Sequence, residues 1–227
     1  MKGILYGVGV GPGDPELITM KAVRLIRACD VIAVPHKEKE RCFALRIASA
    51  AVPEIEAKPI LEIDMPMTRD RDLRERAYAE GASLLIRELD AGKTVVFLTL
   101  GDPMVYSTYG YLHARVCAKG YDAQLVPGVT SFCAASAALG ETLCADREAL
   151  HILPGGASAE EALHLSGTKV FMKGELSALK AAIAKRDLCV RAVENCGTPQ
   201  QTVYADASAL PDDASYYTVL IAKEKQA

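Results

Sequence analysis

The sequence lacks a long hydrophobic run, an excess of positive charge and a signal-peptide pattern. No apolar run approaches the ~20 residues that a membrane-spanning helix requires. The net charge of −3 argues against nonspecific nucleic-acid binding, which depends on a basic surface. The N-terminal stretch breaks into glycines after a short strand-like run and has no apolar core of a signal peptide. We therefore expect a cytoplasmic protein with neither a membrane nor a nucleic acid as partner.

Paired metal-ligand motifs are also missing. The chain has seven cysteines without C-x-x-C spacing, and its four histidines form no H-x-x-x-H pair. Several cysteines lie within apolar runs, as Cys133 does in the segment 132–135. We interpret the cysteines as small buried hydrophobic residues in a reducing compartment rather than as a disulfide framework. No metal site built by the protein is expected.

A common dinucleotide-binding motif and a common catalytic motif are absent as well. Glycines occupy every second position from 7 to 13, which is not the G-x-G-x-x-G dinucleotide fingerprint. Pro12 and Pro15 also remove amide donors that a phosphate cradle would use. Ser107 and Ser131 lie outside any G-x-S-x-G elbow. The sequence is therefore suited to holding ligands more than to covalent catalysis.

What is present is a regular alternation of strands and helices. At 227 residues the chain is long enough for one large domain or two compact ones. Up to about Lys119 the order β-α-β-α-β-α-β-α predicts a parallel sheet with helices on both faces. We expect a boundary at the Gly120 turn, with domains at 1–120 and 121–227. The strands predicted for the second half make a mixed sheet, with antiparallel pairing near its end, and lie at 150–153, 169–172, 189–193, 202–205 and 216–222.

The stretch Val95–Leu100 is the strongest strand of the first half. Six residues that are either β-branched or large and apolar suit a strand buried on both faces, and Gly101 and Pro103 end it. Asp102 is left at the carboxyl end of the strand, where open α/β sheets bind ligands. The alternative is an ordinary helix N-cap. Similar turns follow two other strands, so we expect three ligand-binding turns to meet in one crevice, at 9–14, 101–106 and 127–131.

Three motifs in these turns resemble the tetrapyrrole methylase family: residues 7–17, 100–103 and 127–131. Members of that family transfer methyl groups from S-adenosylmethionine (SAM), mostly to precorrins. The resemblance implies two α/β domains, the first with a mostly parallel sheet and the second with a mixed sheet. It places the ligand cleft between them, with the tetrapyrrole on the side of the first domain and SAM on the side of the second. It also implies a homodimer.

A finer resemblance is to the C20-methyltransferases of cobalamin biosynthesis. It is carried by residues 101–109, by 66–70 upstream and by 33–35 after the second strand. The substrate implied is precorrin-2 or cobalt-factor II. Open alternatives are a methylase for a different corrin carbon, one that acts on diphthine or ribosomal RNA, and a non-catalytic nucleotide-binding module. The negative net charge disfavours the RNA substrate.

The resemblance also implies which residues contact SAM. They are Leu100, Gly101, Asp102, Val105, Thr130, Ser131, Met172, Cys196 and Tyr217. Asp102 would receive the ammonium group or the ribose hydroxyls, and Thr130 and Ser131 would bind the carboxylate. Met172 would pack against the adenine, although a methionine at that position also suits a hydrophobic core.

The reaction, attack of a tetrapyrrole carbon on the SAM methyl group, needs alignment and exclusion of water, and a base to remove a proton from the macrocycle. Asp14 and Tyr106 are the candidates for that base. Gly11 and Pro12 are expected to approach the substrate with their backbone, and Arg69 is expected to bind one of its carboxylates. Asp14 can instead be a helix cap, Tyr106 a wall residue and Arg69 a solvated surface charge.

Overall fold

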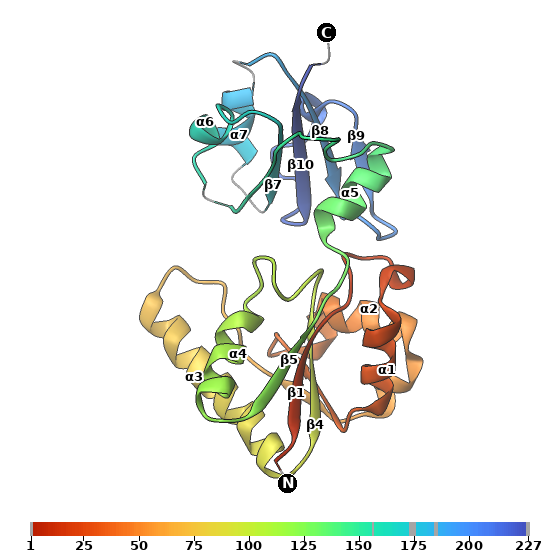
Figure 1. Ribbon diagram of the computed structural model, residues 1–227, viewed down its shortest axis with the longest axis vertical. Coiled ribbons are helices and arrows are strands. Elements are labelled where there is room, and N and C mark those ends of the chain that lie inside the picture. Colours follow the sequence, from red (N-terminus) through yellow and green to blue (C-terminus); the bar gives the residue numbers. More distant parts are fainter. Residues whose placement is uncertain (1, 156, 173–175, 184–185, 226–227) are drawn as a thin grey trace. The chain divides into compact units, whose positions relative to one another are not determined.

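A computed structural model describes residues 2–155, 157–172, 176–183 and 186–225. The chain divides into two compact units, Met1–Thr130 and Ser131–Ala227. Each unit contains its own five-stranded sheet (Figure 1). The division falls after Val126, so the predicted boundary between residues 120 and 121 lies too early. Residues 122–126 form a strand of the first sheet and pair with the first strand of the chain.

The first unit has a fully parallel sheet in the order β3-β2-β4-β1-β5. Its strands are β1 (Ile4–Gly9), β2 (Val31–Val34), β3 (Ile60–Glu62), β4 (Thr94–Thr99) and β5 (Asp122–Val126). Its helices are α1 (Met20–Ala28), α2 (Phe43–Ala51), α3 (Arg71–Asp90) and α4 (Tyr109–Ala118). The predicted alternation of strands and helices is confirmed.

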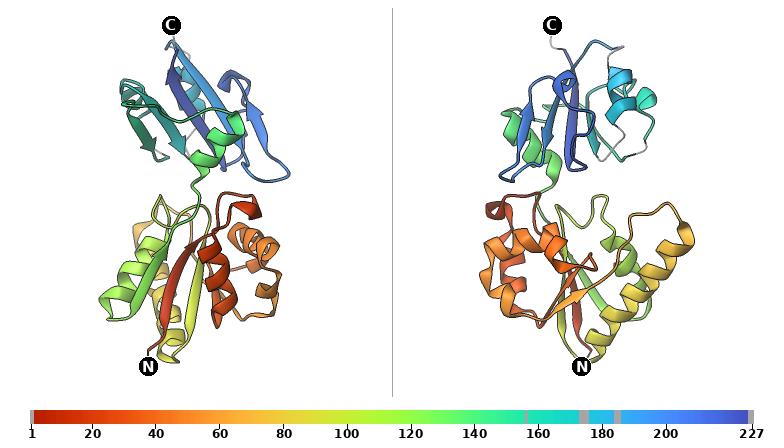
Figure 2. Two further views of the ribbon diagram at one scale, coloured as in Figure 1. Left: turned by 45° about the vertical axis from the view of Figure 1, so that its right-hand side comes forward. Right: turned by 180° about the vertical axis from the view of Figure 1, so that it is seen from behind.

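The central strand β4 is buried on both faces, as its composition predicts. Val95 and Phe97 pack in one apolar cluster with side chains of α3 and α4. Val96 and Leu98 pack on the opposite face, in a cluster with α1 and α2. Figure 2 shows these helix pairs on the two sides of the sheet, the first pair in yellow and green and the second in red and orange. The carboxyl end of β4 is thereby held between two cores.

The first helix begins later than the sequence pattern suggests. Asp14 caps only a short 3-10 helix, Pro15–Leu17, by accepting a hydrogen bond from the Glu16 amide at 2.9 Å. Helix α1 then starts at Met20, where the Thr19 hydroxyl accepts a hydrogen bond from the Ala22 amide. The cap considered for Asp14 is therefore present, but it belongs to a short 3-10 helix, and α1 has a separate cap.

The second unit contains a mixed sheet in the order β6-β7-β10-β8-β9. Among its described strands, β6 and β7 are parallel and the other neighbours are antiparallel, which confirms the expected mixed sheet. The strands are β6 (Leu150–Leu153), β7 (Thr168–Met172), β8 (Leu188–Glu194), β9 (Thr202–Tyr204) and β10 (Thr218–Glu224). Helices α6 (Ala159–Ala162) and α7 (Leu176–Ile183) share an apolar cluster with the sheet, and α5 (Ser131–Leu139) contacts β8 and β10.

Candidate functional site

The three turns expected to form a crevice meet at the carboxyl ends of neighbouring strands in the first sheet. Strand β1 lies between β4 and β5, and all three run parallel, so their carboxyl ends are neighbours. Gly11 and Gly101 form an isolated bridge beyond the strands, with N–H to O distances of 3.3 and 2.8 Å. The turns after β1 and β4 are therefore joined through their backbones. The prediction that these segments converge is confirmed.

Glycine is required where the turns touch. A Cβ atom on Gly9 would lie 2.5 Å from the Gly101 carbonyl oxygen and 2.7 Å from the Gly128 amide nitrogen. Contacts this short are not tolerated, so the three backbones pack directly on one another. Gly101 has φ +70, a conformation that side chains rarely adopt. Where the three turns meet, the surface is therefore formed by backbone atoms without side chains.

Asp102 fastens two of these turns together. Its carboxylate is buried, with 7% of the residue exposed. Oδ1 accepts a hydrogen bond from the Met104 amide at 2.7 Å, and Oδ2 accepts one from the Gly128 amide at 3.0 Å. Each oxygen keeps further acceptor capacity, so a ligand hydroxyl or ammonium group can still bind. Contact between Asp102 and SAM stays a prediction. Asp102 also has a structural role: it caps its own turn through the Met104 amide, and it binds the Gly128 amide of a second turn.

Thr130 carries a polar atom that the fold leaves unsatisfied. Its Oγ1 is buried and has no hydrogen-bond partner among the described residues. Buried hydroxyls are nearly always paired, because an unpaired one loses its bonds to water. A ligand oxygen would supply the missing partner. This observation fits the predicted SAM contact at Thr130. Ser131 follows as the first residue of α5, in the second unit.

The turn after β4 also holds backbone strain. Tyr106 has φ +48, although it is not glycine, and 45% of it is exposed. The left-handed region costs an L-residue about 1–2 kcal/mol. Such strain collects at functional sites. Leu100 and Val105 are partly buried in the same turn. That Tyr106 acts on a proton stays a prediction.

The predicted substrate-binding residues fall in two places. Gly11 and Pro12 are buried beside the bridge to Gly101. Asp14 is half-buried and its Oδ1 caps the short 3-10 helix. Arg69 is exposed on the connection after β3, and β2 separates β3 from β4 in the sheet. The structure therefore brings Gly11 and Pro12 to the joined turns and places Arg69 on a different strand connection of the same edge.

The contacts predicted in the second unit also gather at one edge of their sheet. Met172 ends β7, Cys196 follows β8, and Tyr217 precedes β10. Because β10 is antiparallel to both neighbours, its amino end lies beside their carboxyl ends. Met172 and Cys196 are buried and Tyr217 is exposed. The Tyr217 carbonyl accepts a hydrogen bond from the Asn195 amide at 3.1 Å, which joins the two turns.

Two residues that support the site without being predicted as ligand contacts are Tyr109 and Gly128. Tyr109, the first residue of α4, is fully buried, and its ring occupies the space that a side chain on Gly7 would need. Burial raises the pKa of its phenol well above the usual range, so it stays neutral. Gly128, which donates to Asp102, was also missed as a partner. The only available signal was a glycine just after an apolar strand.

Two general features of the described residues complete the description. No group of three or more His, Cys, Asp or Glu side chains in that part of the chain is arranged to hold a metal ion. Every helix described is also too short or too polar to cross a bilayer.

Comparisons of the sequence with known proteins identify its family and several relatives. A family model described as Tetrapyrrole (Corrin/Porphyrin) Methylases matches residues 4–210. The cobalamin biosynthesis protein CobIJ of Mycobacterium bovis is 38% identical over 160 residues, which are 68% of this chain and 31% of that protein. The chain thus matches less than a third of that relative's length. The cobalt-precorrin-2 C(20)-methyltransferase of Salmonella typhimurium is 31% identical over 235 residues, 99% of this chain and 98% of that protein.

A solved structure shares the fold. It is a uroporphyrin-III C-methyl transferase from Thermus thermophilus, complexed with S-adenyl homocysteine. The TM-score is 0.71 at 24% identity, with 98% of both chains covered.

Proposed function

The chain belongs to the tetrapyrrole (corrin/porphyrin) methylases, and we propose from this membership that it is a SAM-dependent methyltransferase that methylates C20 of precorrin-2 or cobalt-factor II. The observation that carries the proposal is the similarity to the Salmonella typhimurium enzyme, which covers both proteins almost completely. A match of that length includes both units and both groups of predicted SAM contacts. We further propose that the protein acts as a cytoplasmic homodimer in cobalamin biosynthesis.

The donor set of the first unit suits SAM. The unpaired Thr130 hydroxyl would donate to the carboxylate of the amino-acid end. The Asp102 carboxylate, held by two backbone amides, would accept from the ammonium group or the ribose. The bare backbone at Gly101 would lie against the ligand. Leu100, Val105 and Ser131 are proposed as further contacts.

In the second unit, Met172, Cys196 and Tyr217 are proposed to contact the adenine end. Two of the three are buried and apolar in character, as an adenine ring requires. When bound, SAM would supply a methyl group on a positively charged sulfur. The chain would then align the acceptor carbon with that methyl group and keep water away.

The substrate side is proposed at the turn after β1 and on the connection after β3. Gly11 and Pro12 would approach the macrocycle with their backbone, and Arg69 would pair with a carboxylate. Tyr106 or Asp14 would take the proton that the macrocycle loses. Asp14 already accepts the Glu16 amide, so its second oxygen is the one available for that transfer.

Calorimetry with SAM and with S-adenosylhomocysteine tests the proposal. We expect both to bind with one site per chain. Failure of both to bind would overturn the methyltransferase assignment and favour a module of another class. Binding of SAM together with transfer to a different corrin carbon would correct the substrate alone. Light scattering of the purified protein checks the proposed dimer, and a monomer mass would contradict it.

A further inference from the structure

Glu194, the last residue of β8, bonds two segments that are distant in the chain. Its Oε1 accepts a hydrogen bond from the Ser215 amide at 2.6 Å, and its Oε2 accepts one from the Tyr204 hydroxyl at 2.9 Å. Ser215 lies in the turn that precedes β10, and Tyr204 ends β9. One carboxylate therefore ties the ends of three neighbouring strands together.

The turn that Glu194 holds is the one that carries Tyr217. The Ser215 carbonyl accepts the Thr218 hydroxyl at 2.7 Å, and the Ser215 hydroxyl accepts the Tyr217 amide at 3.2 Å. These bonds fold residues 215–218 around the Ser215 backbone. Since the Ser215 amide is bonded to Glu194, that carboxylate holds the start of the turn against the end of β8.

The turn after β8 begins directly after Glu194 and is bonded to the turn that Glu194 holds. Asn195 follows Glu194 directly and has φ +50, so the chain reverses sharply there. The Asn195 amide donates to the Tyr217 carbonyl at 3.1 Å, and the Asn195 carbonyl accepts the Thr198 amide at 3.1 Å. Cys196 is buried inside this turn, with 6% of the residue exposed. Cys196 and Tyr217, both proposed to contact SAM, thus lie in two turns bonded to one another beside Glu194.

We infer that Glu194 is a positioning residue for the cofactor: it contacts no ligand, and it holds the turns of Cys196 and Tyr217 in the arrangement that binds SAM. The inference rests on the proposed function, because Glu194 can position the cofactor only if SAM binds at the turns of Cys196 and Tyr217. Two charge-assisted hydrogen bonds make the carboxylate a stronger tie than a neutral side chain would be. The bond from Tyr204 to Glu194 also raises the pKa of the Tyr204 phenol, so the donor keeps its proton at neutral pH.

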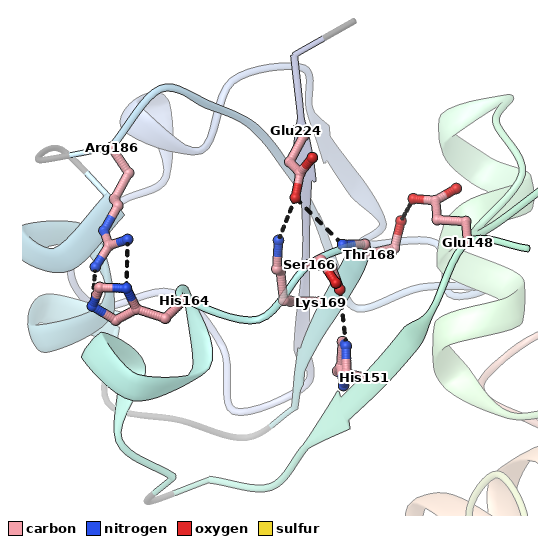
Figure 3. A network of polar contacts seen from close by, with 9 residues as sticks. Glu148, His151, His164, Ser166, Thr168, Lys169, Arg186 and Glu224 are labelled. Carbon is pink, nitrogen blue, oxygen red and sulfur yellow. Dashed lines mark hydrogen bonds and ion pairs between the residues drawn. The ribbon is translucent and has the colours of Figure 1, made fainter.

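Glu148 offers a matched control in the same unit. Its Oε1 accepts the Thr168 hydroxyl at 2.7 Å, and its Oε2 accepts the Ala145 amide at 3.2 Å. Like Glu194, it therefore bonds one hydroxyl and one backbone amide. Figure 3 shows it beside the first residue of β7, whereas Met172 ends that strand at the edge proposed for SAM. Loss of Glu148 should disturb the fold without moving the cofactor turns.

The experiment compares Glu194→Ala, Glu194→Gln and Glu148→Ala in the full chain. Calorimetry gives the Kd of S-adenosylhomocysteine, urea unfolding gives stability, and steady-state kinetics gives the KM of each substrate. We expect Glu194→Ala to raise the Kd and the KM for SAM about tenfold, the order of one hydrogen bond to a charged group. The KM for the tetrapyrrole and the kcat at saturating SAM should stay within about twofold.

Glu194→Gln should restore most of the affinity, because its amide oxygen can accept the Ser215 amide while its NH2 group donates to the Tyr204 oxygen, although both bonds lose their charge assistance. Glu148→Ala should lower stability and leave the Kd unchanged. Equal losses of affinity in Glu194→Ala and Glu148→Ala, or wild-type affinity in Glu194→Ala, would overturn the inference. If Glu194→Ala fails to fold, Tyr204→Phe removes one of the two bonds and should raise the Kd about threefold; an unchanged Kd contradicts the inference. Failure of the wild type to bind refutes the proposed function itself, and the inference falls with it.

Discussion

Replacing Thr130 by valine should strengthen the fold and weaken the cofactor site. Valine keeps the size and the β-branching of threonine and removes the hydroxyl. In the structure that hydroxyl is buried without a partner, so the fold loses no hydrogen bond when it is removed. An unpaired buried polar group costs roughly 1–3 kcal/mol. We therefore expect the free energy of unfolding to rise by about 1 kcal/mol, the lower end of that range.

Binding should respond in the opposite direction. A hydroxyl that donates to a carboxylate contributes about 1.5–3 kcal/mol, which corresponds to a ten- to hundredfold change in Kd. Calorimetry with S-adenosylhomocysteine and urea unfolding of the same preparation measure both effects. Thr130→Val with wild-type affinity, or with reduced stability, would refute the assignment of this hydroxyl to the ligand.

Thr168→Val is the matched control for this substitution. Thr168 is also buried, but its hydroxyl donates to Glu148 at 2.7 Å. Glu148 is exposed, so water can replace the lost partner, and stability should fall only by about 1 kcal/mol, the net contribution of one hydrogen bond, while affinity stays unchanged. The two substitutions should thus change stability in opposite directions, and only Thr130→Val should change affinity, which no general effect of valine on the protein would produce.

Three further predictions concern the turns and the core. Gly9→Ala should destabilise the protein by several kcal/mol in urea unfolding, because its Cβ would lie 2.5 Å from the Gly101 oxygen; a loss below about 0.5 kcal/mol would contradict the packing described. Tyr106→Gly should raise stability by about 1 kcal/mol, because glycine adopts φ +48 without strain, and should lower kcat if this side chain moves the proton. Burial raises the pKa of the Cys29 thiol from 9.0 to about 11, so its stabilising contribution is complete below pH 9 and is lost as the pH rises to 11. Cys29→Ala should remove that part of the pH dependence, up to about 3 kcal/mol in urea unfolding, and an unchanged alkaline profile would disprove the assignment.

Local patterns predicted the elements and the meeting of the three turns well. The apolar run of β4 and the glycines after β1 and β4 are each readable within a few residues, and parallel order then brings their ends together. The domain boundary was wrong because the Gly120 turn resembles a linker, while the pairing of β5 with β1 is a long-range event. The late start of α1 depends on a second cap at Thr19, which competes with the stronger-looking signal at Asp14.

The finer parts of the site depend on contacts that no local pattern contains. Asp102 reads as a cap for its own turn, yet its second oxygen accepts the amide of Gly128, which lies 26 residues away. The unpaired state of the Thr130 hydroxyl is a property of the packed structure. Glu194 was passed over for the same reason, because Ser215 is 21 residues further along the chain.

The central claim is methyl transfer from SAM to C20, and one incubation tests it most directly. The protein is mixed with isotopically labelled SAM and precorrin-2, with and without cobalt in the macrocycle, and the product is examined by mass spectrometry and NMR. We predict a product heavier by one labelled methyl group, with the new signal at C20, and the preferred substrate is the form that reacts faster. A methyl group at another carbon, or no transfer to either form by a protein that binds SAM, would contradict the proposed activity.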